Sequence, residues 1–281
     1  MNEREKFLFD LQGFLVIKNV LTPEEVHKLN ISVDKNLDKQ GEDPNSAVGK
    51  SKTLTGTHKR GIFTGMLAWP RPWSQPFREI IVHRKAIPYL NEIHGRGWRL
   101  DHEPFILTSD YGGEGLLLHG ATNHSFFGAA YYIYTNGQMR CGMVVLQYQL
   151  ADVNEDDGGL CVIPGSHKAN FPCPQEIRNW EVNLEVVYNV PAKAGDLIIF
   201  NEATIHGTLP WKNRERERRS LLVRYSPKYL HYAGGYYDVT FPDWIGELTE
   251  AQRSVLEPPY IYNRPLLEDD GETVVHPNVE Y

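Results

Sequence analysis

The feature that most constrains the fold is a succession of short apolar runs that begins after Gly97. Each run is rich in β-branched and aromatic residues, and turn-forming residues separate it from the next, a pattern typical of strands. The candidate strands are Arg99–Thr108, Cys141–Leu150, Gly159–Ile163, Glu185–Val190, Asp196–Phe200 and Ser220–Tyr225. Because helical signals precede these runs, the order of elements predicts an α+β fold, mainly β, with a β-sandwich or jelly-roll body.

The N-terminal third combines one strand with flanking helices. Phe14–Lys18 is a short apolar run, and the following Thr22–Glu25 has the form of a capping box, which opens a helix. A second helical stretch is expected at 74–94, interrupted by Pro88. The intervening segment 41–65 is polar and contains glycines, so it is predicted to be a loop.

These patterns predict a single domain over residues 1–281. Residues 1–96 are expected to form the N-terminal strand and flanking helices with a loop. Residues 97–232 are expected to form the jelly-roll core, and 233–281 a C-terminal extension that lies on the surface.

Composition and charge exclude several classes of function. Hydrophobic residues make up 41% of the 281 residues and charged residues 23%, which suits a folded chain with a sizeable core. The formal net charge is −7, so nucleic-acid binding is not expected. No apolar run is long enough to span a membrane, and the N-terminus lacks the apolar core of a signal peptide. The three cysteines form no CxxC pair, which favours a cytoplasmic location.

Three segments carry residues capable of chemistry. The first is the apolar run LLLHGA, which contains His119, and the second is DDGGLCVIPGSHK at 156–168. The third runs from AGDLIIFNEATIHG, which contains His206, to RRS at 218–220. Each signal is weak when taken singly, because a lone histidine is often a core residue and glycines often mark turns.

Taken together and in this order, the segments resemble the phytanoyl-CoA dioxygenase-like family of Fe(II)/2-oxoglutarate-dependent oxygenases. The N-terminal FDLQGFLVIKNVLTPEEV also fits, so the resemblance covers residues 7–232. It implies a double-stranded β-helix, a jelly roll or cupin-like barrel with N-terminal flanking helices. It also implies an enzyme, a dioxygenase or a halogenase, that uses Fe(II), 2-oxoglutarate and O2 and acts on a small molecule.

The resemblance assigns roles to particular residues. His119 matches the first iron ligand and His206 the distal one, since Fe(II) suits imidazole nitrogens on one face of the metal. Arg218 matches the arginine that pairs with the far carboxylate of 2-oxoglutarate, together with Ser220 of the R-x-S pattern. Because neighbouring residues on a strand point to opposite faces, only one of Arg218 and Arg219 can serve.

The sequence departs from the family pattern at the first ligand, where His-x-Asp is replaced by His119-Gly120-Ala121. Ala121 cannot bind a metal, and three interpretations stay open. A chloride or bromide ion takes the vacated position, as in the halogenases of this superfamily that carry His-x-Ala or His-x-Gly. Alternatively, water or another side chain fills it, such as Glu202, which lies four residues before His206 at the same strand parity. In the third, iron binding is lost and the chain is a jelly-roll binding module.

The remaining candidates concern the substrate and the other histidines. Tyr131, Gln147 and Trp211 are candidates for the substrate pocket. His167 of the PGSHK motif is not expected to bind iron, and His124 is expected on a loop or at the substrate rim. The choice between hydroxylation and halogenation, the substrate and the oligomeric state stay open.

Overall fold

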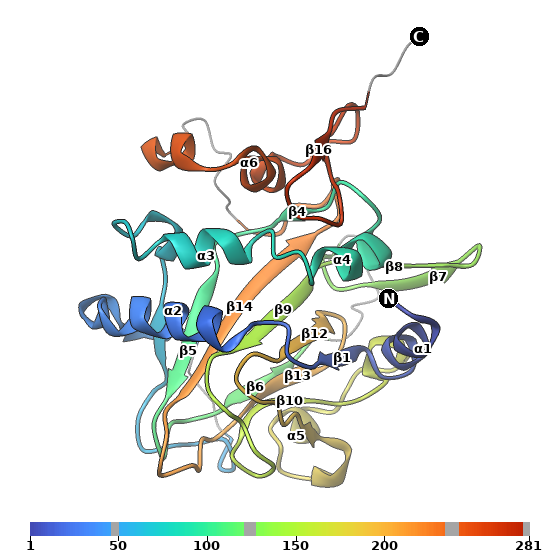
Figure 1. Ribbon diagram of the computed structural model, residues 1–281. Coiled ribbons are helices and arrows are strands. Elements are labelled where there is room, and N and C mark those ends of the chain that lie inside the picture. Colours follow the sequence, from blue (N-terminus) through green and yellow to red (C-terminus); the bar gives the residue numbers. More distant parts are fainter. Residues whose placement is uncertain (46–50, 121–127, 234–241, 278–281) are drawn as a thin grey trace.

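The computed structural model describes residues 1–45, 51–120, 128–233 and 242–277. Its body is a pair of antiparallel sheets, a larger and a smaller one (Figure 1). In spatial order the larger sheet contains β1 (Phe14–Ile17), β12 (Leu197–Asn201), β9 (Val144–Gln149), β14 (Arg218–Ser226), β5 (Phe105–Ser109), β3 (Gly61–Phe63) and β2 (Gly41–Glu42), with β4 (Arg99–Leu100) beside β14. The smaller sheet contains β11 (Tyr188–Asn189), β10 (Gly159–Val162), β13 (His206–Leu209) and β6 (Leu116–His119).

The two sheets pack face to face, which confirms the predicted jelly-roll fold. Along β12, Ile198 and Phe200 face the smaller sheet and pack in a core that also holds Leu160 of β10. Leu197 and Ile199 point the other way, into a second core beneath the helices. Both faces of this strand are therefore buried, as its continuous apolar sequence requires.

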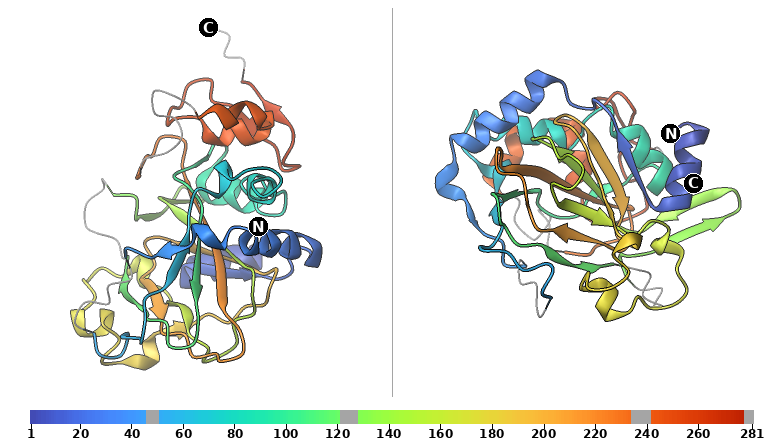
Figure 2. Two further views of the ribbon diagram at one scale, coloured as in Figure 1. Left: turned by 90° about the vertical axis from the view of Figure 1, so that its left-hand side faces the viewer. Right: turned by 90° about the horizontal axis from the view of Figure 1, so that it is seen from below.

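Helices cover the outer face of the larger sheet (Figure 1 and Figure 2). The α-helices are α1 (Glu3–Gln12), α2 (Pro23–Asp34), α3 (Gln75–Ile80), α4 (Ile87–His94), α5 (Gln175–Arg178) and α6 (Glu250–Leu256). Short 3₁₀ turns are η1 (Leu37–Lys39), η2 (Met66–Ala68), η3 (Ser166–Lys168), η4 (Leu184–Val186) and η5 (Asp243–Glu247). Two hairpins stand outside the sheets, β7 (Tyr132–Thr135) with β8 (Gln138–Cys141), and β15 (Leu266–Leu267) with β16 (Val274–Val275). Within the described ranges, no helix has the length and apolar character needed to cross a membrane.

The structure confirms the helix start predicted at Thr22–Glu25 and corrects the helix break predicted at Pro88. The capping box at the start of α2 is confirmed, because Thr22 and Glu25 each accept a hydrogen bond from the other's backbone N–H. Pro88 does not interrupt a helix. It lies in the first turn of α4, where no backbone N–H is needed, and the break falls before it, between α3 and α4.

The structure also corrects the predicted boundaries. The segment 41–65 is more than a loop, because it contains β2 and β3, which extend the larger sheet beyond β5. Glu185–Val190 is a strand only at Tyr188–Asn189 and begins as a 3₁₀ turn. The C-terminal extension is not confined to the surface, since Leu256 and Leu267 are buried in the core beneath the helices.

Candidate active site

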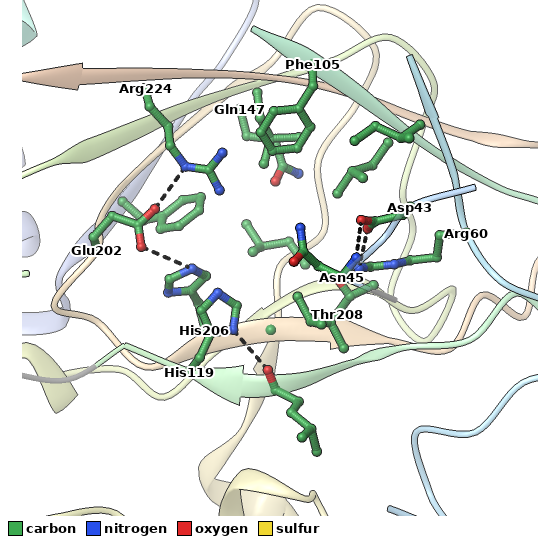
Figure 3. A pocket seen from close by; sticks show the side chains of 18 of the residues that line it. Asp43, Asn45, Arg60, Phe105, His119, Gln147, Glu202, His206, Thr208 and Arg224 are labelled. Carbon is green, nitrogen blue, oxygen red and sulfur yellow. Dashed lines mark hydrogen bonds and ion pairs between the residues drawn. The ribbon is translucent and has the colours of Figure 1, made fainter. Parts of the chain in front are cut away.

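A cavity of about 780 Å³ lies between the two sheets (Figure 3). Much of its wall is apolar and comes from both sheets: Ile62, Phe105, Leu107, Leu116, Leu117, Met143, Leu160, Phe200 and Leu222. Its polar residues include three arginines, three histidines and two carboxylates: Arg60, Arg218, Arg224, His102, His119, His206, Asp43 and Glu202. A cavity with a mostly apolar wall and a few convergent polar groups is typical of a small-molecule site.

Two of these histidines are direct neighbours across a strand pair. His119 ends β6 and His206 begins β13, and the register of the antiparallel pair sets them opposite each other. Their ring centroids are 4.3 Å apart. Residues separated by most of the jelly roll in sequence therefore meet at one point of the cavity.

The local backbone fixes the orientation of both imidazole rings. Nδ1 of His119 donates to the carbonyl of Leu117 at 2.9 Å, and Nδ1 of His206 donates to the carbonyl of Thr204 at 2.7 Å. A carbonyl oxygen only accepts, so the proton of each neutral ring lies on Nδ1 and Nε2 keeps its lone pair. Metal-binding histidines are held in this way in most proteins. Burial, together with the neighbouring His119, lowers the pKa of His206 to about 4, so this ring is neutral at neutral pH.

A partly buried carboxylate, whose side chain is 12% exposed, lies beside the histidines. Glu202 occupies the turn between β12 and β13, and its Oε2 is 3.7 Å from Nε2 of His206. Its other oxygen accepts a hydrogen bond of 3.1 Å from Nε of Arg224 (Figure 3). Burial raises the pKa of Glu202, but the charge and hydrogen bond of Arg224 act in the opposite direction, and the pKa lies below its usual value, so the group is charged.

Arg218 reaches the cavity from the larger sheet and is 1% exposed. Its Nε donates to Oγ of Ser220 at 3.3 Å, and that hydroxyl in turn donates to Oε1 of Gln149 at 2.9 Å. Nη1 of Arg218 is buried without a hydrogen-bond partner, and no carboxylate of the described chain lies within ion-pair distance of the guanidinium. Burial, reinforced by the nearby Arg60, lowers the pKa of Arg218 to about 9.

The paired glycines of the DDGGL segment make room for this arginine. Gly159 has a φ of +79°, and a Cβ added there would lie 3.3 Å from Nε of Arg218. Glycine is therefore favoured both by the backbone conformation and by the close approach of the guanidinium. The motif read from the sequence as a turn also shapes the site.

The adjacent Arg219 points to the outer face of β14. Its guanidinium pairs with Asp34 of α2 at 2.7 Å and with Glu217 at 2.5 Å. Arg218 is thus the member of the pair that faces the cavity, and Arg219 is already neutralised by carboxylates.

Of the other predicted residues, some line the cavity and some do not. Gln147 lines the cavity, and its Nε2 is buried with no partner in the part of the chain that the structure describes. Tyr131 and Trp211 lie outside the lining formed by the described residues. The Tyr131 hydroxyl bonds to that of Tyr229, and the buried Trp211 indole donates to the carbonyl of Arg216, so both side chains have structural partners. Nε2 of His167 bonds to the carbonyl of Asp10, away from the cavity.

Two predicted residues lie outside the described part of the chain, namely Ala121 and His124. The sequence marks Arg60 only as one of several cationic and aromatic residues of the segment 41–75 that could meet an anionic or aromatic substrate. In the structure it is buried and donates to Oγ1 of Thr208 at 2.9 Å. Its partner Asp43, at 2.6 Å, was missed, because a single carboxylate in a stretch without apolar periodicity gives no signal. Arg224 was missed as well, although it follows Arg218 at even spacing on β14 and therefore shares its face.

The arrangement fits an iron ion with a dicarboxylate, with one position left open. Two imidazole Nε2 atoms with free lone pairs face one cavity, and an unpaired buried guanidinium matches the far carboxylate. Across the described residues, however, no three His, Cys, Asp or Glu side chains converge closely enough to hold a metal.

Comparison with known proteins supports the fold and the family. A family model described as phytanoyl-CoA dioxygenase matches residues 9–220. HygX from Streptomyces hygroscopicus, solved with nickel and 2-oxoglutarate bound, is similar with a TM-score of 0.66 and 22% identity over 82% of this chain and 89% of that chain. SnoN, a non-heme alpha-ketoglutarate-dependent epimerase from nogalamycin biosynthesis, gives 0.58 and 18% over 81% and 83%. SnoK, a carbocyclase from the same biosynthesis, gives 0.58 and 16% over 89% and 91%. Among curated protein sequences none matches this chain.

Proposed function

Since the chain belongs to the phytanoyl-CoA dioxygenase family of Fe(II)/2-oxoglutarate-dependent oxygenases, we propose that it uses Fe(II), 2-oxoglutarate and O2 to functionalise a C–H bond of a small molecule. One observation carries the proposal. Two backbone-oriented imidazoles and a buried arginine without a carboxylate partner among the described residues face the same cavity. HygX and SnoN have been solved with 2-oxoglutarate and with metal ions bound, which is consistent with this use of the fold.

In this proposal His119 and His206 hold the iron through Nε2. The carbonyls of Leu117 and Thr204 keep each ring in the tautomer that binds metal and prevent it from turning. When bound, iron with 2-oxoglutarate as co-reductant supplies the activation of O2 that breaks the substrate's C–H bond. The chain's own residues bind, orient and desolvate the reactants.

Arg218 binds the far carboxylate of 2-oxoglutarate. A planar guanidinium can donate two parallel hydrogen bonds to a carboxylate, and Nη1 of Arg218 has no other described partner. Ser220 orients the guanidinium, because its hydroxyl accepts from Nε and is itself fixed by Gln149. The apolar wall excludes water, which strengthens this ion pair.

The substrate enters the part of the cavity near Gln147, Phe105 and Arg224, which lie across from the histidines in Figure 3. The relatives with bound ligands hold hygromycin B and nogalamycin RO, both small molecules. We propose a small-molecule substrate here too. The cytoplasmic location stays a prediction.

The test is turnover. With Fe(II) and 2-oxoglutarate in air, the protein should consume 2-oxoglutarate and release succinate, even slowly without its substrate. His206→Ala should abolish this, while His27→Ala, on the exposed surface of α2, should not change it. No succinate from the intact protein, and no binding of either ligand, would instead favour a jelly-roll binding module.

Halogenation is a second candidate, favoured by one observation. Ala121 stands where the family pattern has aspartate, so a chloride or bromide ion could take that position on the iron. Products formed in bromide buffer would then carry bromine. Products that contain no halogen at any halide concentration would instead favour hydroxylation.

A further inference from the structure

We propose that Glu202 is the carboxylate ligand of the iron and replaces the aspartate that position 121 lacks. This inference rests on the proposed function. In the family pattern the carboxylate ligand follows the first histidine, whereas Glu202 lies in the turn that precedes the second histidine, His206.

The backbone of Glu202 is fixed at the edge of the site. Its N–H donates to the carbonyl of Met143 at 3.1 Å, and the next residue, Ala203, donates to Oδ1 of Asn201 at 2.9 Å. The N–H of Thr204 donates to the carbonyl of Asn201 at 2.8 Å. The turn between β12 and β13 is therefore rigid, and it directs the Glu202 side chain into the cavity (Figure 3).

The same turn packs against the residue that follows the first histidine. A Cβ added to Gly120 would lie 2.8 Å from the carbonyl oxygen of Glu202 and 2.6 Å from that of Thr204. Gly120 separates His119 from position 121. The backbone of Glu202 therefore lies against Gly120, one residue before the position at which the family pattern has its aspartate ligand.

The spacing of donor atoms suits a shared metal. Two ligand atoms that each lie about 2.1 Å from one metal ion are about 3 Å apart at a right angle and about 4 Å apart when opposite. Oε2 of Glu202 is 3.7 Å from Nε2 of His206, within that range. Since no three such side chains of the described chain yet converge, Glu202 must turn about its side-chain bonds to complete the set with His119.

The contacts of Glu202 show which of its oxygens is available. Nδ1 of His206 donates a hydrogen bond to the carbonyl of Thr204, so Nε2 is the ring nitrogen that lies near Oε2 of Glu202. Arg224 holds Oε1 only, which leaves Oε2 directed toward the histidines. Oε2 would therefore be available to bind a metal ion held by His206.

Glu202 and a halide are alternatives at the third position. Each brings one negative charge, and a site already holding the carboxylate has no charge deficit for an anion to fill. The inference therefore predicts metal binding that does not depend on chloride or bromide.

The experiment is anaerobic calorimetric titration of the whole protein with Fe(II), and with Co(II) to follow the absorption spectrum. Glu202→Gln keeps the shape and an acceptor for Arg224 but loses the charge. Metal affinity should fall at least about tenfold and the Co(II) spectrum should change. Glu103→Gln is the control, because Glu103 is a partly buried glutamate outside the described lining of the cavity.

A second variant separates ligation from a structural role. Ala121→Asp in the Glu202→Gln background returns a carboxylate to the family position and should restore metal affinity. A Glu202 that only pairs with Arg224 would not be replaced in this way, so absence of rescue together with a lowered Tm would overturn the inference.

The remaining outcomes distinguish the two proposals. Equal metal affinity in Glu202→Gln and the unaltered protein, or affinity that rises with bromide, would overturn the ligand assignment while the oxygenase proposal stands. An unaltered protein that binds neither metal nor 2-oxoglutarate would overturn both.

Discussion

Replacing Arg218 by methionine should stabilise the protein without ligand while it strongly weakens cosubstrate binding. The guanidinium is 1% exposed, lies near the cationic Arg60 and has a buried Nη1 without a partner. Methionine keeps a flexible chain in the same space and removes the buried charge. The site is thus expected to trade stability for function, as sites built to receive a charged ligand do.

The size of the effect follows from the burial of the charge. Burial lowers the pKa of Arg218 to about 9, so at any pH below about 9 the group is charged in both the folded and the unfolded chain and carries its full cost. Replacing buried ionic groups by hydrophobic side chains of similar volume is often neutral or stabilises proteins by about 1–4 kcal/mol, and the gain should be largest where, as at Arg218, the charge has no partner. For a chain of this size, each kcal/mol raises Tm by about 2–4 °C.

Cosubstrate binding should change in the opposite direction. Removing the charged partner of a buried carboxylate costs about 2–4 kcal/mol, which weakens 2-oxoglutarate binding by about 30- to 700-fold. In the unaltered protein, 2-oxoglutarate at 100 times its Kd should stabilise the fold by about 2.7 kcal/mol. Arg218→Met should lose that stabilisation.

The assay is thermal unfolding with Mn(II), with and without 2-oxoglutarate. Arg219→Met is the matched control, because Arg219 pairs with Asp34 and Glu217 on the outer face of β14. It should not raise Tm and should keep the shift on addition of 2-oxoglutarate. A lower Tm for Arg218→Met without ligand, combined with an undiminished shift by 2-oxoglutarate, would refute the reasoning.

Two further predictions concern residues around the site. Gly159→Ala forces a non-glycine residue to a φ of +79° and presses a methyl group against Arg218. The free energy of unfolding should fall by about 1–3 kcal/mol in thermal unfolding, and ligand titration should show weaker 2-oxoglutarate binding. Unchanged affinity would show that the close approach of Gly159 to Arg218 is unimportant. Trp211→Phe removes the indole N–H that donates to the carbonyl of Arg216, so Tm should fall by an amount equivalent to about 1–3 kcal/mol while the 2-oxoglutarate affinity is unchanged. A loss of substrate turnover without a change in Tm would instead support the role in the substrate pocket that the sequence suggests.

Much of the fold could be predicted because its main strands carry a local signal. β9, β12 and β14 contain the apolar segments 144–146, 197–200 and 221–223, since side chains on both faces of these strands are buried. β2 and β3 could not be found in this way. They have two and three residues, too few to show the period of a strand, and they are strands only because β3 pairs with β5, a contact between distant parts of the chain. The resemblance to the family, confirmed by the match over residues 9–220, supplied the jelly-roll fold, which periodicity alone could not distinguish from a β-sandwich.

In the site, too, residues that stand in local motifs could be predicted, and residues placed by contacts between distant segments could not. His119, His206 and Arg218 stand in motifs, so their sequence positions could be read directly. The burial of Arg60 and its ion pair with Asp43 could not be predicted, because they depend on how the segment 41–65 crosses the sheets.

The position of Glu202 differs from the one its spacing suggests. It shares no strand with His206, because β13 begins at that histidine, and a turn directs its side chain into the cavity. Tyr131 and Trp211 are aromatic residues near the motifs, but hydrogen bonds to Tyr229 and Arg216 hold them outside the described lining of the cavity.

The most direct test of the central claim is a crystal structure grown without oxygen in the presence of Fe(II) and 2-oxoglutarate. The account predicts iron bonded to Nε2 of both His119 and His206, with the far carboxylate of 2-oxoglutarate paired with the guanidinium of Arg218. Iron bound away from either histidine, or 2-oxoglutarate whose far carboxylate pairs with Arg60 or Arg224 and leaves Arg218 without a partner, would contradict it.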